Sequence, residues 1–149
     1  MKRPIACVVY LLSLSPIFGA DSLLVGTWVR RDTKEPIHIT VKVEAASAGL
    51  KLTYTIITAQ APAGQVMTVL TQLDGKDAAA MVDGKPSGET MAIQSIDSRH
   101  TNAIVKMQGQ QMGSSKSEIS LDGKVLKVEN TTNGPDGKLA TAVEYWDKK

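Results

Sequence analysis

Cysteine is almost absent from the 149 residues: Cys7 is the only one, and it lies in the apolar segment that opens the chain. A lone cysteine leaves no intramolecular disulfide, so a core of apolar side chains has to stabilise the domain. Beyond that segment the chain has no thiol. Thiol catalysis and paired-cysteine metal sites are therefore excluded there.

Residues for other common chemistries are equally scarce. Histidine occurs only as His38 and His100, far apart in the sequence, and there is neither a His-x-His pair nor a Gly-x-Ser-x-Gly motif. The run Asp97-Ser98-Arg99-His100 contains acid and base groups, but a charged hairpin turn explains it more simply than a catalytic cluster. We therefore expect no enzyme activity, no metal site and no cofactor.

The charges do not favour nucleic acid as a partner. The chain has 17 Lys and Arg residues against 15 Asp and Glu residues. Lys2 and Arg3, at the start of the chain, account for the whole excess. The remaining charges are scattered and form no basic stripe, which a nucleic-acid-binding protein would need.

The first 22 residues have the three-part layout of a secretory signal peptide. The start is positively charged, an apolar run covers residues 5–14, and a breaker and small residues follow. The run is too short to span a membrane as a helix. Cleavage after Ala20 or after Ser22 would leave one domain, residues 23–149, in the periplasm or outside the cell. An uncleaved N-terminal anchor is the alternative.

Beyond residue 25 the hydrophobic pattern has a period of two residues, which indicates strands rather than helices. In residues 37–43, Ile37, Ile39 and Val41 share one face, and the polar residues between them share the other. A first strand is expected around Trp28. Further strands are predicted at residues 50–58, 65–72, 78–82, 90–96, 102–108, 115–121, 124–131 and 139–146.

The turns favour a barrel. Asp-Gly-Lys occurs four times, starting at Asp74, Asp83, Asp122 and Asp136. Asp-Gly between alternating runs is a strong hairpin signal, because glycine accepts the positive φ that such turns need. Strands joined by tight turns pair with their neighbours, and a meander of about eight to ten strands removes its edges by closing. We predict an all-β, single up-and-down antiparallel barrel.

The two ends of the domain resemble the calycin group, which includes lipocalins, fatty-acid-binding proteins, avidins and small bacterial lipocalin-like secreted proteins. The resemblance lies in Leu24-Val25-Gly26-Thr27-Trp28 and in Val143-Glu144-Tyr145-Trp146-Asp147-Lys148. It implies that Trp28 packs across the closed end of the barrel, against a basic residue from the last strand. Lys148 is the candidate for this cation–π partner.

Several features of the known families in that group are missing. A strand beginning near Pro36 leaves no room for the helical lid of fatty-acid-binding proteins. Their last strand also carries an Arg-x-Tyr pair that holds the ligand carboxylate, whereas this chain has Glu144 and no arginine there. Avidins surround biotin with several tryptophans, and this chain has only Trp28 and Trp146. Small bacterial barrels that inhibit metalloproteases also begin Gly-x-Trp, so an inhibitor remains an alternative.

Methionine is plentiful beyond residue 25, where phenylalanine is absent. The residues are Met67, Met81, Met91, Met107 and Met112. Thioether clusters can bind Cu(I), but these residues lie in separate segments without a Met-x-Met pair. Filling irregular core space in place of aromatic side chains is the simpler interpretation.

The expected function is non-catalytic binding of a small apolar or amphipathic molecule inside the barrel. A barrel of this size can hold one small ligand, and methionine side chains adapt to apolar ones. The expected cavity-lining residues are Tyr54, Ile56, Met67, Met91, Met107 and Tyr145. One alternative is a protein-binding module, such as a secreted protease inhibitor, acting through its hairpin loops. The other is a structural barrel with a filled interior. We expect a monomer that does not insert into membranes.

Overall fold

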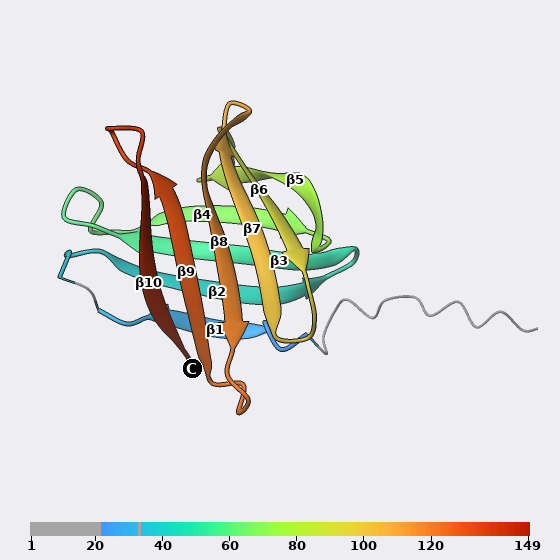
Figure 1. The fold of residues 1–149 in the computed structure, drawn as a ribbon. Coiled ribbons are helices and arrows are strands. Elements are labelled where there is room, and N and C mark those ends of the chain that lie inside the picture. The colour runs from blue at the N-terminus through green and yellow to red at the C-terminus, as the bar shows by residue number, and fades with distance from the viewer. Residues whose placement is uncertain (1–21, 33) are drawn as a thin grey trace, which may run out of the picture.

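In a computed structural model, which describes residues 22–32 and 34–149, the described chain forms a closed barrel of ten antiparallel strands (Figure 1). The strands are β1 Gly26–Arg30, β2 His38–Ala46, β3 Gly49–Ile57, β4 Gln65–Thr71, β5 Asp74–Val82, β6 Lys85–Ser95, β7 His100–Met107, β8 Gln110–Ile119, β9 Val125–Asn133 and β10 Leu139–Lys148. The signal peptide expected at residues 1–22 lies outside the described residues, except for Ser22.

The predicted all-β, up-and-down architecture is confirmed. Each strand pairs with its neighbours in the sequence, and β1 pairs with β10 to close the barrel. Along β2 and β3 the apolar side chains alternate as expected, and Val41, Val43, Leu50 and Leu52 are buried. Among the described residues no helix is long and apolar enough to cross a membrane.

Three strands begin at least four residues earlier than the alternation indicates: β5, β6 and β8. For β6 and β8 the reason is a two-residue hairpin. At the β5–β6 turn, Asp83 and Gly84 have φ values of 48° and 79°, and at the β7–β8 turn Gln108 and Gly109 have 50° and 82°. Two successive positive φ values match the twist of the flanking strands, so pairing continues up to the turn. Gln-Gly is a weaker turn signal than Asp-Gly, and the turn at Gln108-Gly109 was not predicted from the sequence.

The first Asp-Gly-Lys copy does not form the hairpin turn that was expected of it. The chain reverses at Leu73, a buried residue with a φ of 56°, and Asp74 already belongs to β5. The register of β5 against β6 is irregular between Asp74 and Asp77, and Gly75 has a φ of 78°. Here Asp-Gly builds a β-bulge, a second use of positive φ in a sheet.

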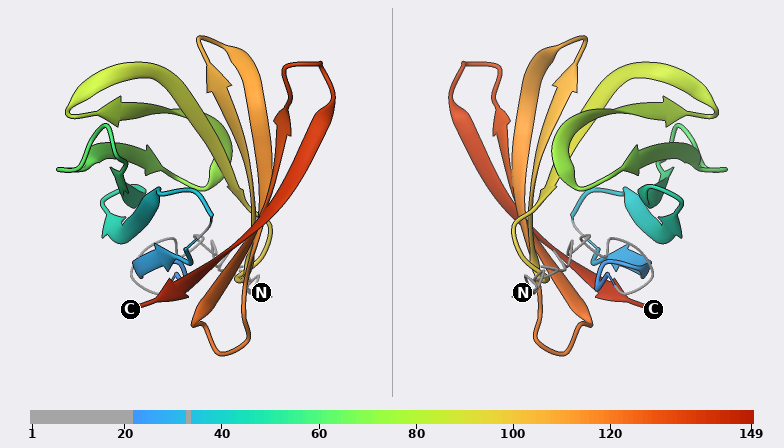
Figure 2. Two further views of the ribbon diagram at one scale, coloured as in Figure 1. Left: turned by 90° about the vertical axis from the view of Figure 1, so that its left-hand side faces the viewer. Right: turned by 90° about the vertical axis from the view of Figure 1, so that its right-hand side faces the viewer.

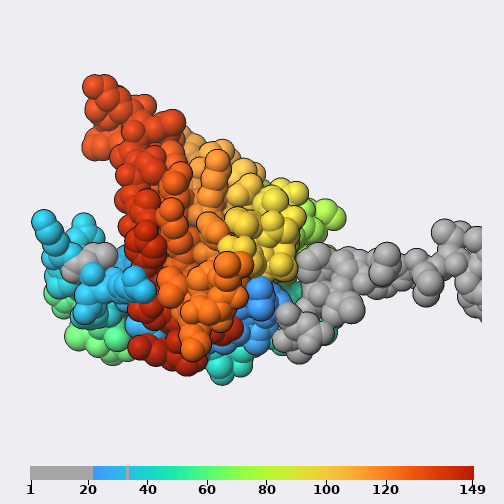
Figure 3. Space-filling model, turned by 60° about the horizontal axis from the view of Figure 1, so that its bottom comes forward, coloured from blue at the N-terminus to red at the C-terminus, as the bar shows by residue number. Residues whose placement is uncertain are grey.

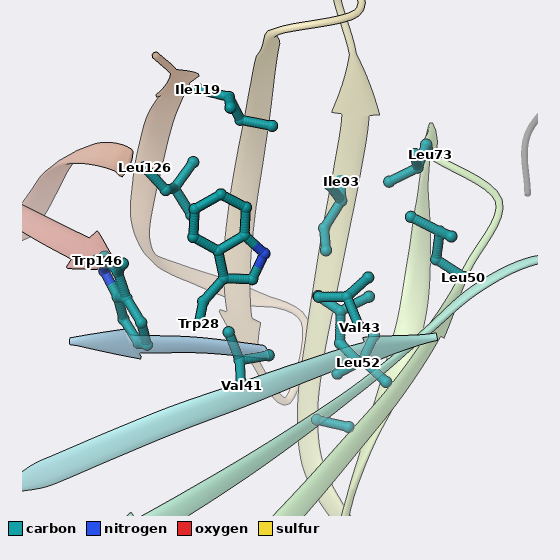
Figure 4. Packing of buried hydrophobic residues seen from close by; sticks show 12 residues of the cluster. Trp28, Val41, Val43, Leu50, Leu52, Leu73, Ile93, Ile119, Leu126 and Trp146 are labelled. Atoms are coloured by element: carbon teal, nitrogen blue, oxygen red, sulfur yellow. The ribbon is translucent and has the colours of Figure 1, made fainter. Parts of the chain in front are cut away.

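One end of the barrel is closed by the hydrophobic core. The first residues of β1, the last residues of β10 and the turns β2–β3, β4–β5, β6–β7 and β8–β9 lie at this closed end, because consecutive strands are antiparallel. Trp28 is completely buried there, among side chains that include Leu126, Ile93 and Trp146 (Figure 4). From this side, β1, the β8–β9 hairpin and the end of β10 pack together on the surface (Figure 3).

The opposite end is called here the open end. In the side views, the tips of the β7–β8 and β9–β10 hairpins lie at this end, far from the C-terminus (Figure 2). The large buried side chains around Trp28 fill the half of the interior next to the closed end, and the other half is left for the cavity described below.

Candidate functional site

A cavity of about 560 Å³ occupies the barrel interior. Trp28, Leu126 and Trp146 from the closed-end core form its floor. Met112, Thr132 and Ala142 also line it, although each is exposed to solvent, so the cavity opens beside β8, β9 and β10. This volume lies within the range of pockets that hold a small organic ligand.

One wall of the cavity is apolar. It comes from β2, β3 and β4, whose inward residues follow the two-residue period. The residues on it are Val41, Val43, Leu52, Tyr54 and Met67. Met91 of β6 adds a second methionine to the cavity lining. This surface suits an aliphatic or aromatic group.

The facing wall carries most of the polar side chains of the cavity and is called here the polar wall, although Ala103, Val105 and Val128 line it too. Its polar side chains come from neighbouring positions of β7, β8 and β9: Thr101, Ser115, Ser117, Asn130 and Thr132. Ser115 lies opposite Asn130, and Thr101 lies opposite Ser117. None of these five side chains makes a hydrogen bond to another residue in the described part of the chain. Four of these residues are half-buried and Thr132 is exposed, so their polar groups can bond to water or to a ligand.

Two carboxylates also face the cavity, and they differ in their partners. Glu144 accepts a hydrogen bond from Arg30 Nη1, with 3.2 Å between nitrogen and oxygen, and Arg30 Nη2 donates to the Ile37 carbonyl oxygen at 2.7 Å. The Arg30 side chain is only 9 % exposed, so this is a largely buried ion pair. Glu89 has no side-chain hydrogen bond or ion pair within the described residues.

Tyr54 is close enough to Glu89 to be affected by its charge. Burial inside the barrel, and to a lesser extent the negative charge of Glu89, raises the pKa of Tyr54 to about 12. The phenol is therefore neutral at physiological pH. It has no hydrogen-bond partner among the described residues and can donate one to a ligand.

The structure brings half of the six expected cavity residues together. Tyr54, Met67 and Met91 line the cavity, and the other three do not. Ile56 and Met107 lie further toward the open end, beyond the lining residues of their strands.

Tyr145 is on the wrong face for a cavity residue, because its neighbours Glu144 and Trp146 are the ones that point inward. In a strand, a shift of one residue exchanges inside for outside. The Tyr145 ring instead lies on the outer surface, under the Arg31 guanidinium at 5.4 Å from its centroid.

Trp28 and Lys148 meet at the seam between β1 and β10. They are register partners, and Lys148 Nζ lies 5.1 Å from the centre of the Trp28 ring. Trp28 Nε1 donates to the Leu24 carbonyl oxygen at 2.8 Å, and Lys148 Nζ donates to the Leu23 carbonyl oxygen at 3.1 Å. Both bonds tie the segment before β1 to the closed end.

The histidines lie away from the cavity. His100 Nδ1 is 2.8 Å from Asp97 Oδ1, and that same oxygen accepts the backbone N–H groups of Arg99 and His100. These hydrogen bonds hold the pKa of Asp97 below its usual range. Asp97 therefore builds the β6–β7 turn, as a charged hairpin turn would. His38 is exposed and lies 3.1 Å from Asp32.

The polar wall was missed at the sequence level, although a signal was present. From Gln110 to Ser117, strand β8 has Met112 as its one large apolar residue. A strand without an apolar face cannot pack on a filled core, so this composition indicates a wall beside open space. Met112 itself lies at a register irregularity between β7 and β8, which periodicity alone cannot locate.

Comparison of the chain with protein-family models, with curated proteins and with solved structures finds no match. The cavity is therefore the feature from which a function can be inferred.

Proposed function

We propose that this protein binds one small amphipathic molecule inside its barrel, without catalysis, after export to the periplasm or the extracellular space. The observation that carries the proposal is the two-faced cavity of about 560 Å³. Its apolar wall would hold the hydrophobic part of the ligand. Its polar wall offers hydroxyl and amide groups that have no protein partner.

This cavity argues against a barrel with a filled interior. A structural barrel gains stability from close packing, and open space beside Met67 and Met91 forgoes those contacts. A binding role accounts for this open space.

Binding can be tested with N-phenyl-1-naphthylamine, an uncharged dye whose fluorescence rises in apolar surroundings. We expect saturable binding with one site per chain. The variant Ala142→Trp should abolish it, because residue 142 lines the cavity beside its opening and the indole would fill that space.

Val143→Trp is the matched control, since Val143 is the next residue of β10 and is exposed. It introduces the same side chain on the same strand but outside the barrel. The proposal predicts normal dye binding in this variant. Absence of binding to the wild-type protein, or equal binding to the two variants, would contradict it.

A further inference from the structure

We propose that the cavity selects amphiphiles with a positively charged head group, and that Glu89 is the residue that binds this group. This inference rests on the proposed function and specifies the class of ligand. Three observations lead to it. Among the described residues, the only charged side chains that line the cavity are those of Glu89 and Glu144, Glu144 is paired with Arg30, and Glu89 lies toward the open end.

The cavity wall carries acidic side chains and no basic ones. Of the described residues that line it, Glu89 and Glu144 have carboxylates, and none is lysine, arginine or histidine. An amphiphile with an anionic head group would thus find no positive charge on the wall. Its carboxylate or phosphate would lose hydration without gaining an ion pair, which is unfavourable in an enclosed site.

Glu144 is already paired. Arg30 reaches it from β1, with 3.2 Å between Nη1 and Oε1, and holds it against the seam of the barrel. The two opposite charges cancel within the barrel wall. Glu144 is therefore unavailable to a ligand cation unless Arg30 is displaced.

Glu89 is the charge that remains. Its backbone N–H donates to Ser87 Oγ at 3.1 Å, but its carboxylate has no ion-pair or hydrogen-bond partner in residues 22–32 and 34–149. The cavity thus holds one negative charge that the protein does not neutralise. An ammonium group would supply the missing partner and form charge-assisted hydrogen bonds.

The position of Glu89 also fits a head group. It lies two residues along β6 from the cavity-lining Met91, toward the open end, and opposite Met107 of β7. Tyr54 lines the same space and senses the charge of Glu89. A cation bound at Glu89 would lie within reach of the aromatic ring of Tyr54, whose face attracts positive charge. The hydrocarbon tail would then extend over the apolar wall toward Trp28.

The test compares three ligands with the same tail: decylamine, which is protonated at neutral pH, decanol and decanoate. Each is titrated against the wild-type protein loaded with N-phenyl-1-naphthylamine, and dye displacement gives the dissociation constant. We expect decylamine to bind about tenfold more tightly than decanol, the scale expected for a hydrogen-bonded ion pair. Decanoate should bind more weakly than decanol.

Glu89→Gln should remove the advantage of decylamine and leave decanol binding within about twofold of wild type. Glu129→Gln is the matched control, because Glu129 is exposed on β9 between the cavity-lining Val128 and Asn130. It removes the same charge from the outer face and should preserve the tenfold preference.

The outcomes separate this inference from the proposed function. If decylamine, decanol and decanoate displace the dye equally well, charge selection is wrong although binding itself stands. The same conclusion follows if Glu89→Gln keeps the preference, or if Glu129→Gln loses it. If neither the dye nor any of the three ligands binds the wild-type protein, both proposals are wrong.

Discussion

The ammonium group of Lys148 lies 5.1 Å from the centre of the Trp28 ring, and the two residues are directly opposite each other where β1 meets β10. This pairing joins the first strand to the last at the end of the barrel that the core closes. Trp28 is completely buried. The contact therefore closes the barrel, and the cavity lies on the other side of the same indole.

Replacing Trp28 by alanine should lower the free energy of unfolding by about 3–5 kcal/mol, because it leaves a large void in the core. Lys148→Met keeps most of the aliphatic stem and removes the charge, and should cost only about 0.5–1 kcal/mol. Urea denaturation followed by circular dichroism measures both. A small loss for Trp28→Ala would refute its role in closing the barrel.

A side chain at Gly26 is expected to displace the end of the Lys148 side chain and to strain the backbone. Its φ is 137°, and an added Cβ would lie 2.5 Å from Lys148 Cε. Gly26→Ala should therefore destabilise the protein by about 1–3 kcal/mol. In a Lys148→Ala background the clash disappears and the backbone strain remains, so the same substitution should cost less. An equal cost in both backgrounds would contradict the proposed contact.

The fold was predictable because the two-residue period and the turn residues agree. Ile37, Ile39 and Val41 identify a strand whatever its partners are, and Asp122-Gly123 identifies a hairpin. The errors lie where local signals are ambiguous. Asp74-Gly75 has the same residues as a turn but forms a bulge, and only the pairing of β5 with β6 decides between the two.

The free energy of unfolding should fall at high pH because the Tyr54 phenol ionises. The folded state raises the pKa of Tyr54 from 10.0 to about 12, so the unfolded chain releases this proton first. As pH rises from about 10 to about 12, the unfolded state is therefore favoured, and the contribution of Tyr54 to stability is lost.

Tyr54→Phe removes the ionisable group, and its stability should vary less over this interval. Urea midpoints measured across it compare the two proteins. Tyr145→Phe is the control, because this ring lies on the outer surface beside Arg31. Parallel curves for the wild-type protein and Tyr54→Phe would show that Tyr54 is not held neutral by its surroundings.

Arg30→Met should lower the free energy of unfolding by about 1–3 kcal/mol, because it leaves the Glu144 carboxylate and the Ile37 carbonyl oxygen without their donor. The double variant Arg30→Met with Glu144→Leu removes the stranded charge and should recover part of the loss. Thermal unfolding measures all three proteins. A double variant less stable than Arg30→Met would contradict this account of the pair.

The candidate site was less predictable than the fold. Alternation places Tyr54 and Met67 on the inner face. It cannot locate the level along the barrel at which the packed core ends and the cavity begins. Tyr145 was assigned to the inside, but it is next to Trp146 in the strand, so only one of these two aromatic residues can face inward. Glu89 could not be recognised either, since an unpaired carboxylate is defined by the neighbours that the closed barrel brings to it.

The most direct test is native mass spectrometry of the protein purified under mild conditions from its source. We expect one amphiphile of low mass per chain, carrying an amine or another cationic group, and its loss on denaturation. A chain that carries no small molecule and takes up none when decylamine is added would contradict this expectation. So would a chain recovered only in complex with a second protein.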